Sequence, residues 1–298
     1  MRIDLFGQSR TVDDAVASAR IAAEAGMHTF WLPQIASITP LVTLAVAAGE
    51  IEEIRLGTAV VPVQTTHPVL LARQARTLSQ VSNGRFTLGI GVAHRPIVEE
   101  EWGLPFDRPV GYLEEYLDVL LPLLDEQEVA ATGERLSARA TIDIPAPPVP
   151  VMLAALGPRM LDLAGRRTTG TITWMVGPRT LAGHTVPAIT AASAAAGNPP
   201  PQIVAGYPVC VTDDPETARG WAARAYAGYG DLPSYRAMLD REGAAGPADL
   251  AVVGEAIVVR EHFEEIFDAG ATAITVSIFG PRPLREATLQ ALAAMTGG

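Results

Sequence analysis

Three Gly-Pro-Arg steps, each directly after a short apolar run, are the feature of this sequence that most suggests chemistry. They are Gly157-Pro158-Arg159, Gly177-Pro178-Arg179 and Gly280-Pro281-Arg282. Glycine allows a sharp reversal after a strand, and proline is favoured as the first residue of a helix, where its missing N–H needs no partner. Such a helix directs free N–H groups and a positive dipole end over the strand end, which suits an anion such as phosphate.

Each step taken singly is better explained as a plain strand-to-helix turn with a solvated arginine. Three of them together should bring several helix starts to one face of the fold. We therefore expect at least one step to bind phosphate. The step at Gly157 lies in the most regular strand-turn-helix pattern, between Pro150 and Arg179.

The types of residue that are missing or isolated narrow the chemistry further. The sequence has no lysine, which excludes Schiff-base aldolases, PLP enzymes and P-loop NTPases. The single cysteine, Cys210, lies in an apolar run and is expected to be a buried, unreactive thiol. No metal is expected, because no two histidines have the spacing of a local metal pair; a site built from distant ligands stays open. The histidines are His28, His67, His94, His184 and His262.

Length and charge set the broad class of the protein. The chain has 298 residues, 48% of them apolar, and a net charge of −11. The acidity argues against a nucleic-acid partner, because phosphate backbones attract basic surfaces. No apolar run approaches the roughly 20 residues of a membrane span, and the first expected strand begins at Ile3, which leaves no room for a leader. We expect a cytoplasmic protein that acts on a small molecule.

Strands and helices alternate along the whole chain. Eight apolar runs predict buried strands, and a helical pattern lies between each strand and the next, which predicts a parallel sheet. Eight such units favour an α/β fold of the (β/α)8 TIM-barrel type, as one domain over residues 1–298 with insertions at 95–150 and 230–254, after strands four and seven. The expected strands are Ile3–Phe6, Thr29–Pro33, Ile54–Val61, Phe86–Val92, Val151–Ala155, Ile172–Val176, Ile203–Val211 and Ala273–Phe279. Chemistry on such a barrel belongs at the carboxyl ends of the strands.

Four segments resemble the luciferase-like monooxygenase superfamily, in particular its branch that uses the deazaflavin coenzyme F420. They are Leu56–Pro68, Ser82–His94, Asp107–Leu124 and Ala154–Pro178. The resemblance implies a cofactor ring in the barrel mouth, against a bulge with a non-prolyl cis peptide bond that matches Ala59-Val60. It places the cofactor phosphate on the turn and helix start Ala155, Leu156, Gly157, Pro158, Arg159 and Met160. Val92 and Trp174 would flank the cofactor, although Trp174 is equally consistent with core packing.

Two positions depart from the pattern of the F420-dependent relatives. Where several have an acidic residue followed by histidine at the end of strand two, this chain has Pro33-Gln34. Where some have a proton-donating glutamate at the end of strand four, this chain has His94. Histidine exchanges protons near neutral pH, so we assign His94 as the acid/base or ring-contacting residue and set Gln34 beside the reacting centre. His67 precedes Pro68 and is expected to cap a helix.

The resemblance thus implies an oxidoreductase that transfers a hydride between C5 of F420 and a small organic substrate. Two alternatives stay open: an FMN-dependent monooxygenase that uses O2, and a cofactor-binding protein without turnover. The loops 95–108 and 230–254 are expected to choose the substrate. The resemblance also implies a possible homodimer.

Overall fold

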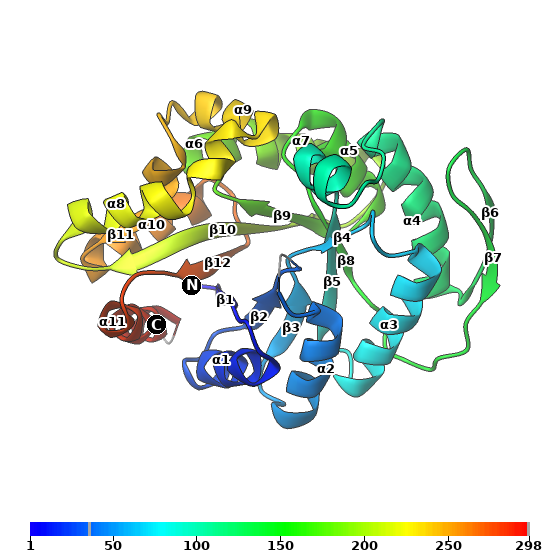
Figure 1. Ribbon diagram of the computed structural model, residues 1–298, viewed down its shortest axis with the longest axis horizontal. Helices are drawn as coiled ribbons and strands as arrows, with labels where there is room; N and C mark the ends of the chain where they lie inside the picture. The colour runs from blue at the N-terminus through cyan, green and yellow to red at the C-terminus, as the bar shows by residue number, and fades with distance from the viewer. Residues whose placement is uncertain (35–36, 297–298) are drawn as a thin grey trace.

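Eight parallel strands close into a barrel in the computed structural model, which describes residues 1–34 and 37–296 (Figure 1). The barrel closes because β10 pairs with β9 on one side and with β12 on the other. The predicted TIM-barrel fold is therefore confirmed. Its strands are β1 (Ile3–Phe6), β2 (Thr29–Leu32), β3 (Arg55–Thr58), β5 (Phe86–Gly91), β8 (Val151–Ala154), β9 (Gly170–Trp174), β10 (Gln202–Val211) and β12 (Ala273–Ile278).

The barrel interior is filled by alternate residues of the strands. A cluster around Trp31 includes Met152, Ile172, Val204 and Ala273, all of them buried. Glycine at position 57 makes room for the indole, since a Cβ there would come within 2.3 Å of the Trp31 ring. The side chains at the other alternate positions of each strand face the helices. Both faces of the strands are therefore buried, which is why the strands are continuous apolar runs in the sequence.

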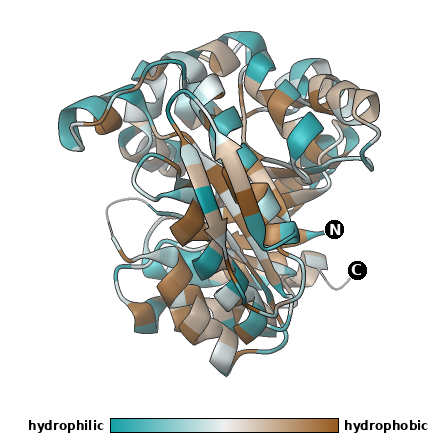
Figure 2. Ribbon diagram, turned by 90° about the vertical axis from the view of Figure 1, so that its right-hand side faces the viewer, coloured by the Kyte–Doolittle hydropathy of each residue, from teal (hydrophilic) through white to brown (hydrophobic). Residues whose placement is uncertain are grey.

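Eleven α-helices among the described residues surround or extend the barrel. Figure 2 shows apolar and neutral residues along the central strands and hydrophilic residues spread over the surrounding helices and loops. The imidazole Nδ1 of His67 accepts a hydrogen bond from the Val69 N–H at 3.3 Å, so His67 caps a helix as predicted. The helices are α1 (Val12–Glu24), α2 (Pro40–Glu50), α3 (Pro68–Val81), α4 (Pro109–Asp125), α5 (Pro158–Arg167), α6 (Pro178–Thr180), α7 (Val186–Ala195), α8 (Pro215–Ala225), α9 (Pro233–Glu242), α10 (Ala256–Asp268) and α11 (Arg282–Thr296).

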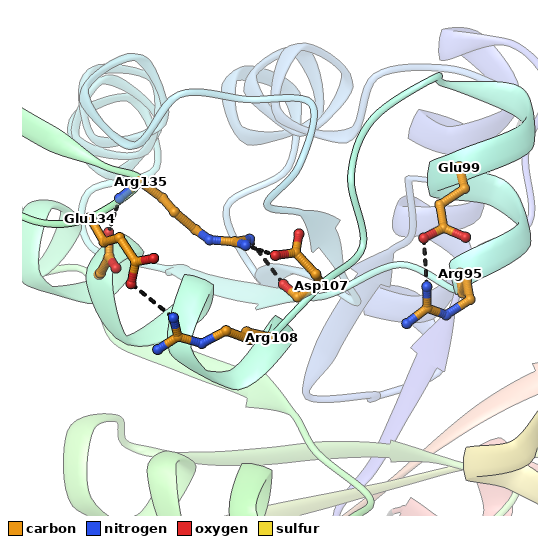
Figure 3. A network of polar contacts seen from close by, with 7 residues as sticks. Arg95, Glu99, Asp107, Arg108, Glu134 and Arg135 are labelled. Atoms are coloured by element: carbon orange, nitrogen blue, oxygen red, sulfur yellow. Dashed lines mark hydrogen bonds and ion pairs between the residues drawn. The ribbon is translucent and has the colours of Figure 1, made fainter.

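The segment 95–150 contains both a barrel helix and an added hairpin. Helix α4 packs between α3 and α5 and belongs to the outer ring. Strands β6 (Glu128–Thr132) and β7 (Ser137–Thr141) form an antiparallel hairpin outside α4 (Figure 1). Ion pairs tie the hairpin turn to the loop before α4: Arg108 contacts Glu134 at 2.8 Å, and Arg135 contacts Asp107 (Figure 3). Only the 95–108 loop and the hairpin region therefore extend beyond the barrel pattern.

The segment 230–254 is more regular than the turn-rich excursion we expected. It contains α9 and a short strand, β11 (Val252–Gly254), which pairs with the end of β10. The helix was missed because its sequence, PSYRAMLDRE, has no strong apolar stripe and lies between glycine-rich stretches.

Two features of the described residues bear on other functions. No described helix has the length and hydropathy needed to cross a bilayer. Residues 1–34 and 37–296 contain no cluster of three or more His, Cys, Asp or Glu side chains suited to a metal ion.

Candidate cofactor and substrate site

The floor of the barrel mouth is formed where the third strand of the barrel is interrupted. The peptide bond between Ala59 and Val60 is cis, as the family resemblance predicts, and the chain resumes as β4 (Val61–Pro62), paired with β5. Just before the break, the Thr58 hydroxyl donates to the Gly89 carbonyl at 2.7 Å and accepts from the Gly89 N–H at 2.9 Å. The side chains of Ala59 and Val60 pack on the interior cluster and stay partly exposed.

Close packing at this floor requires a glycine. A Cβ at Gly91 would meet the side chains of Ala154 and Val60 at 3.0 and 3.1 Å, so only glycine fits between them without displacement. Val92, which follows, is partly exposed at the same strand ends. The backbone N–H of Gln34 donates to the Val60 carbonyl at 3.4 Å, which places Gln34 next to the floor.

His94 lies at the end of β5, with its ring turned toward the helix α9. The imidazole meets the Tyr235 ring edge-on, at 5.7 Å between ring centres. Partial burial lowers the pKa of His94 from its ordinary value near 6.5, so the ring is mainly neutral at neutral pH. A neutral imidazole can accept a proton or a hydrogen bond from a group in the mouth.

The turn after β8 presents an open helix start. Gly157 is the N-cap of α5 with no side chain capping it, and a Cβ added there would meet nothing within 4 Å. The carbonyl of Leu156 accepts a hydrogen bond from His184 Nε2 at 2.8 Å. Because the carbonyl and the next N–H point in opposite directions across a trans peptide, this contact turns the Gly157 N–H away from His184.

The side chains around this turn differ in their accessibility to a ligand. Arg159 is exposed, and no acidic group in the described part of the chain forms an ion pair with it. Met160 is partly exposed, whereas the Ala155 side chain is only 1% exposed. Ala155 can therefore offer only its backbone to a ligand. A cavity of about 260 Å³ opens beside Pro158 and Arg159 against α4.

The other two Gly-Pro-Arg steps each contact an acidic side chain of the chain itself. At the start of α6, the Glu242 carboxylate accepts hydrogen bonds from the Arg179 N–H at 3.1 Å and the Thr180 N–H at 2.7 Å. At the third step, Arg282 pairs with Glu286 one turn along α11, at 2.8 Å. Glu242 therefore occupies the helix start at Gly177, whereas no side chain caps the start at Gly157.

Trp174, at the end of β9, belongs to a cluster of aromatic rings that sequence reasoning did not assemble. Its ring stacks on Phe6 at 5.2 Å between centres and contacts Tyr226 at 6.1 Å and Tyr229 at 6.5 Å. Its indole N–H is buried without a hydrogen-bond partner. The sequence does contain a signal for this cluster, because three of the six tyrosines lie between positions 226 and 235.

Comparison with known proteins identifies the family of the chain. Residues 3–274 match the family model described as luciferase-like monooxygenase. The 5,10-methylenetetrahydromethanopterin reductase of Methanolobus tindarius is 27% identical over 243 residues, which are 80% of this chain and 73% of that protein.

Two solved structures share the fold. One is the coenzyme F420 dependent tetrahydromethanopterin reductase of Methanopyrus kandleri, with a TM-score of 0.83, 20% identity, and coverage of 98% of this chain and 96% of that one. The other is the oxygenating constituent of 3,6-diketocamphane monooxygenase of Pseudomonas putida, in complex with FMN, with a TM-score of 0.79, 19% identity, and coverage of 98% and 96%. The family match extends over nearly the whole barrel, and the chain belongs to the luciferase-like monooxygenase family.

Proposed function

We propose that this protein is an F420-dependent oxidoreductase that transfers a hydride between C5 of the deazaflavin and a small organic substrate. Membership of the luciferase-like family makes it an oxidoreductase of the flavin or deazaflavin type. The similarity to a methylenetetrahydromethanopterin reductase, and the F420 dependence of the M. kandleri reductase of the same fold, support the deazaflavin.

The observation that carries the proposal is the pairing of a partly exposed apolar floor with an open helix start at the carboxyl ends of the barrel strands. Ala59, Val60 and Val92 offer a small, partly exposed apolar surface of the kind that a flat ring needs. Gly157 leaves open space in front of the free N–H groups of α5, where a phosphate is favoured by the helix dipole. These residues therefore fit a ring-and-phosphate cofactor.

The remaining roles follow from position. Gly157 to Met160 would hold the phosphate, with Arg159 available as a counter-charge, and Trp174 and the floor would hold the ring. The deazaflavin, when bound, supplies hydride chemistry at C5. His94 would accept the proton that leaves a substrate oxygen, or return it in the opposite direction, and Gln34 would help to orient the reacting group.

Titration of the purified protein with F420 and, in parallel, with FMN tests the proposal through quenching of cofactor fluorescence. We expect micromolar binding of F420 and weaker binding of FMN. Gly157→Asp is the sharpest variant, because its carboxylate would cap α5 and compete with the phosphate. Since Gly157 has the extended backbone of an N-cap, at φ −80° and ψ 156°, this variant should fold normally and bind F420 at least about tenfold more weakly. Gly157→Ala is the matched control.

FMN-dependent monooxygenation is the second candidate, favoured by the FMN-bound structure of the same fold. Preferential binding of FMN would select it. Binding of F420 without spectral change under any reductant or acceptor would select a binding protein without turnover. Binding of neither cofactor would overturn the proposal.

A further inference from the structure

An unbroken series of ring contacts runs from the barrel to α9 across the mouth. Phe6 stacks on Trp174, Trp174 contacts Tyr229, Tyr229 meets Tyr235 edge-on at 4.8 Å, and Tyr235 meets His94. We call Phe6, Trp174, Tyr226, Tyr229 and Tyr235 the aromatic wall. It brings together the proposed proton acceptor, the end of β9 and the segment expected to choose the substrate.

The wall differs from ordinary core packing in two respects. Core aromatic residues such as Phe30, Phe86 and Phe263 are fully buried, whereas Phe6, Trp174, Tyr229 and Tyr235 all keep part of their surface exposed. The second difference is the buried Trp174 indole N–H, which has no partner that meets hydrogen-bond geometry although the Tyr229 side chain lies beside it. A buried donor left unpaired costs free energy, which an acceptor atom on a ligand would recover.

The wall carries no charge at neutral pH. Burial raises the pKa of Tyr226 and of Tyr229, so their hydroxyls stay protonated. The adjacent arginine, Arg236, is engaged elsewhere: its Nε donates to Asp240, and its other two nitrogens donate to the carbonyls of Ala244 and Ala245. An anionic substrate would therefore lose water against the wall without gaining Arg236 as a counter-ion.

Helix α9 is held in place from its far end. Glu242 bonds the start of α6, and Gly177 leaves the room for it, since a Cβ there would come within 2.2 Å of the carboxylate. The wall is thus formed before any ligand binds, which favours recognition of a rigid, flat molecule.

We propose that the aromatic wall binds the substrate, and that the substrate class is planar, uncharged organic molecules with an oxygen that accepts a hydrogen bond from Trp174. Calling the bound molecule a substrate rests on the proposed function, whereas the assignment of the wall as a binding surface does not. Aromatic ketones and the corresponding alcohols are the simplest members of this class.

Calorimetric titration of the purified full chain with four probes tests the proposal. Acetophenone has the ring and the acceptor, ethylbenzene lacks the acceptor, cyclohexyl methyl ketone lacks the flat ring, and benzenesulfonate adds a charge. We expect acetophenone to bind at least about fivefold more tightly than each of the others. Equal or tighter binding of benzenesulfonate or of the non-planar ketone, or no binding of acetophenone, would overturn the proposal.

Two variants locate the binding. Trp174→Phe keeps a ring but removes the N–H, so it should weaken the binding of acetophenone about fivefold and leave the binding of ethylbenzene unchanged. Trp102→Phe, outside the wall, is the matched control. Tyr235→Ala should weaken the binding of both probes, whereas Tyr235→Phe should bind them with affinities within about twofold of the wild type. Wild-type binding by Trp174→Phe and Tyr235→Ala would place the ligand elsewhere and refute the proposal. Selective acetophenone binding without F420 binding would refute the proposed function and leave this inference standing.

Discussion

Replacing Asp4 by asparagine should remove a pH-dependent penalty on the folded state. Asp4 is fully buried at the base of the barrel, where one carboxylate oxygen accepts from the Trp31 indole N–H at 2.8 Å. The other oxygen has no hydrogen bond and lies 3.9 Å from Arg2 Nε. Burial raises the pKa of Asp4 from 3.8 to about 6, against the smaller opposing effects of Trp31 and Arg2.

The sign of the effect follows from proton linkage. Between the unfolded pKa of 3.8 and the folded value of about 6, the folded chain holds a proton that the unfolded chain has lost, so stability falls as the pH rises. Above the folded pKa the loss is complete and amounts to about 3 kcal/mol. Asparagine keeps an oxygen for Trp31 and does not titrate.

Urea denaturation of the wild type and of Asp4→Asn, repeated between about pH 4 and about pH 8, would measure this pH-dependent loss of stability. The stability of the variant relative to the wild type should rise by about 2.5 kcal/mol over that range and level off above about pH 7, because other titrating groups cancel in the difference. Asp213→Asn, on an exposed side chain, is the control and should give a flat difference. A difference for Asp4→Asn that is also flat, within about 0.5 kcal/mol, would refute the reasoning.

Three further outcomes are expected. Glu242→Ala should lower the free energy of unfolding by about 1–2 kcal/mol in urea titration, because two N–H groups at the start of α6 lose their acceptor; Glu261→Ala is the control, and equal losses would contradict the cap. His94→Ala should lower kcat by about a hundredfold or more with little change in cofactor affinity, and unchanged turnover would remove His94 from the chemistry. Helices α2 and α3 pack together and expose Val42, 59% exposed, and Leu70, 50% exposed. We expect a homodimer through this face, which Val42→Asp with Leu70→Asp should dissociate in sedimentation; a monomeric wild type would contradict it.

The barrel could be predicted from sequence because its signals are local. Each strand is a short apolar run, and its burial on both faces needs no knowledge of its neighbours, as in Phe86–Gly91, where every residue is buried. The closing of the sheet through β9, β10 and β12 then follows from the number of strands.

The substrate side of the site could not be predicted in this way. Tyr235 meets His94, which is far away in the chain, through a helix with a weak apolar pattern, so neither residue indicates the contact. His184 likewise reaches the Leu156 carbonyl from a turn, Leu181–Thr185, that resembles an ordinary helix in sequence. The resemblance that matched the cis peptide at Ala59-Val60 gave no indication of these contacts.

The three Gly-Pro-Arg steps show why an anion-binding pattern does not identify the anion. Gly157 and Gly177 have nearly the same backbone, with φ and ψ of −80° and 156° in one and −73° and 166° in the other, so both present free N–H groups. Glu242 reaches the second because α9 packs against α6, and no part of the pattern around Gly177 encodes that helix. The fold thus uses one helix start to fix the aromatic wall and leaves the equivalent start at Gly157 open. The same electrostatic preference therefore holds the proposed substrate surface in place and is available to the proposed cofactor phosphate.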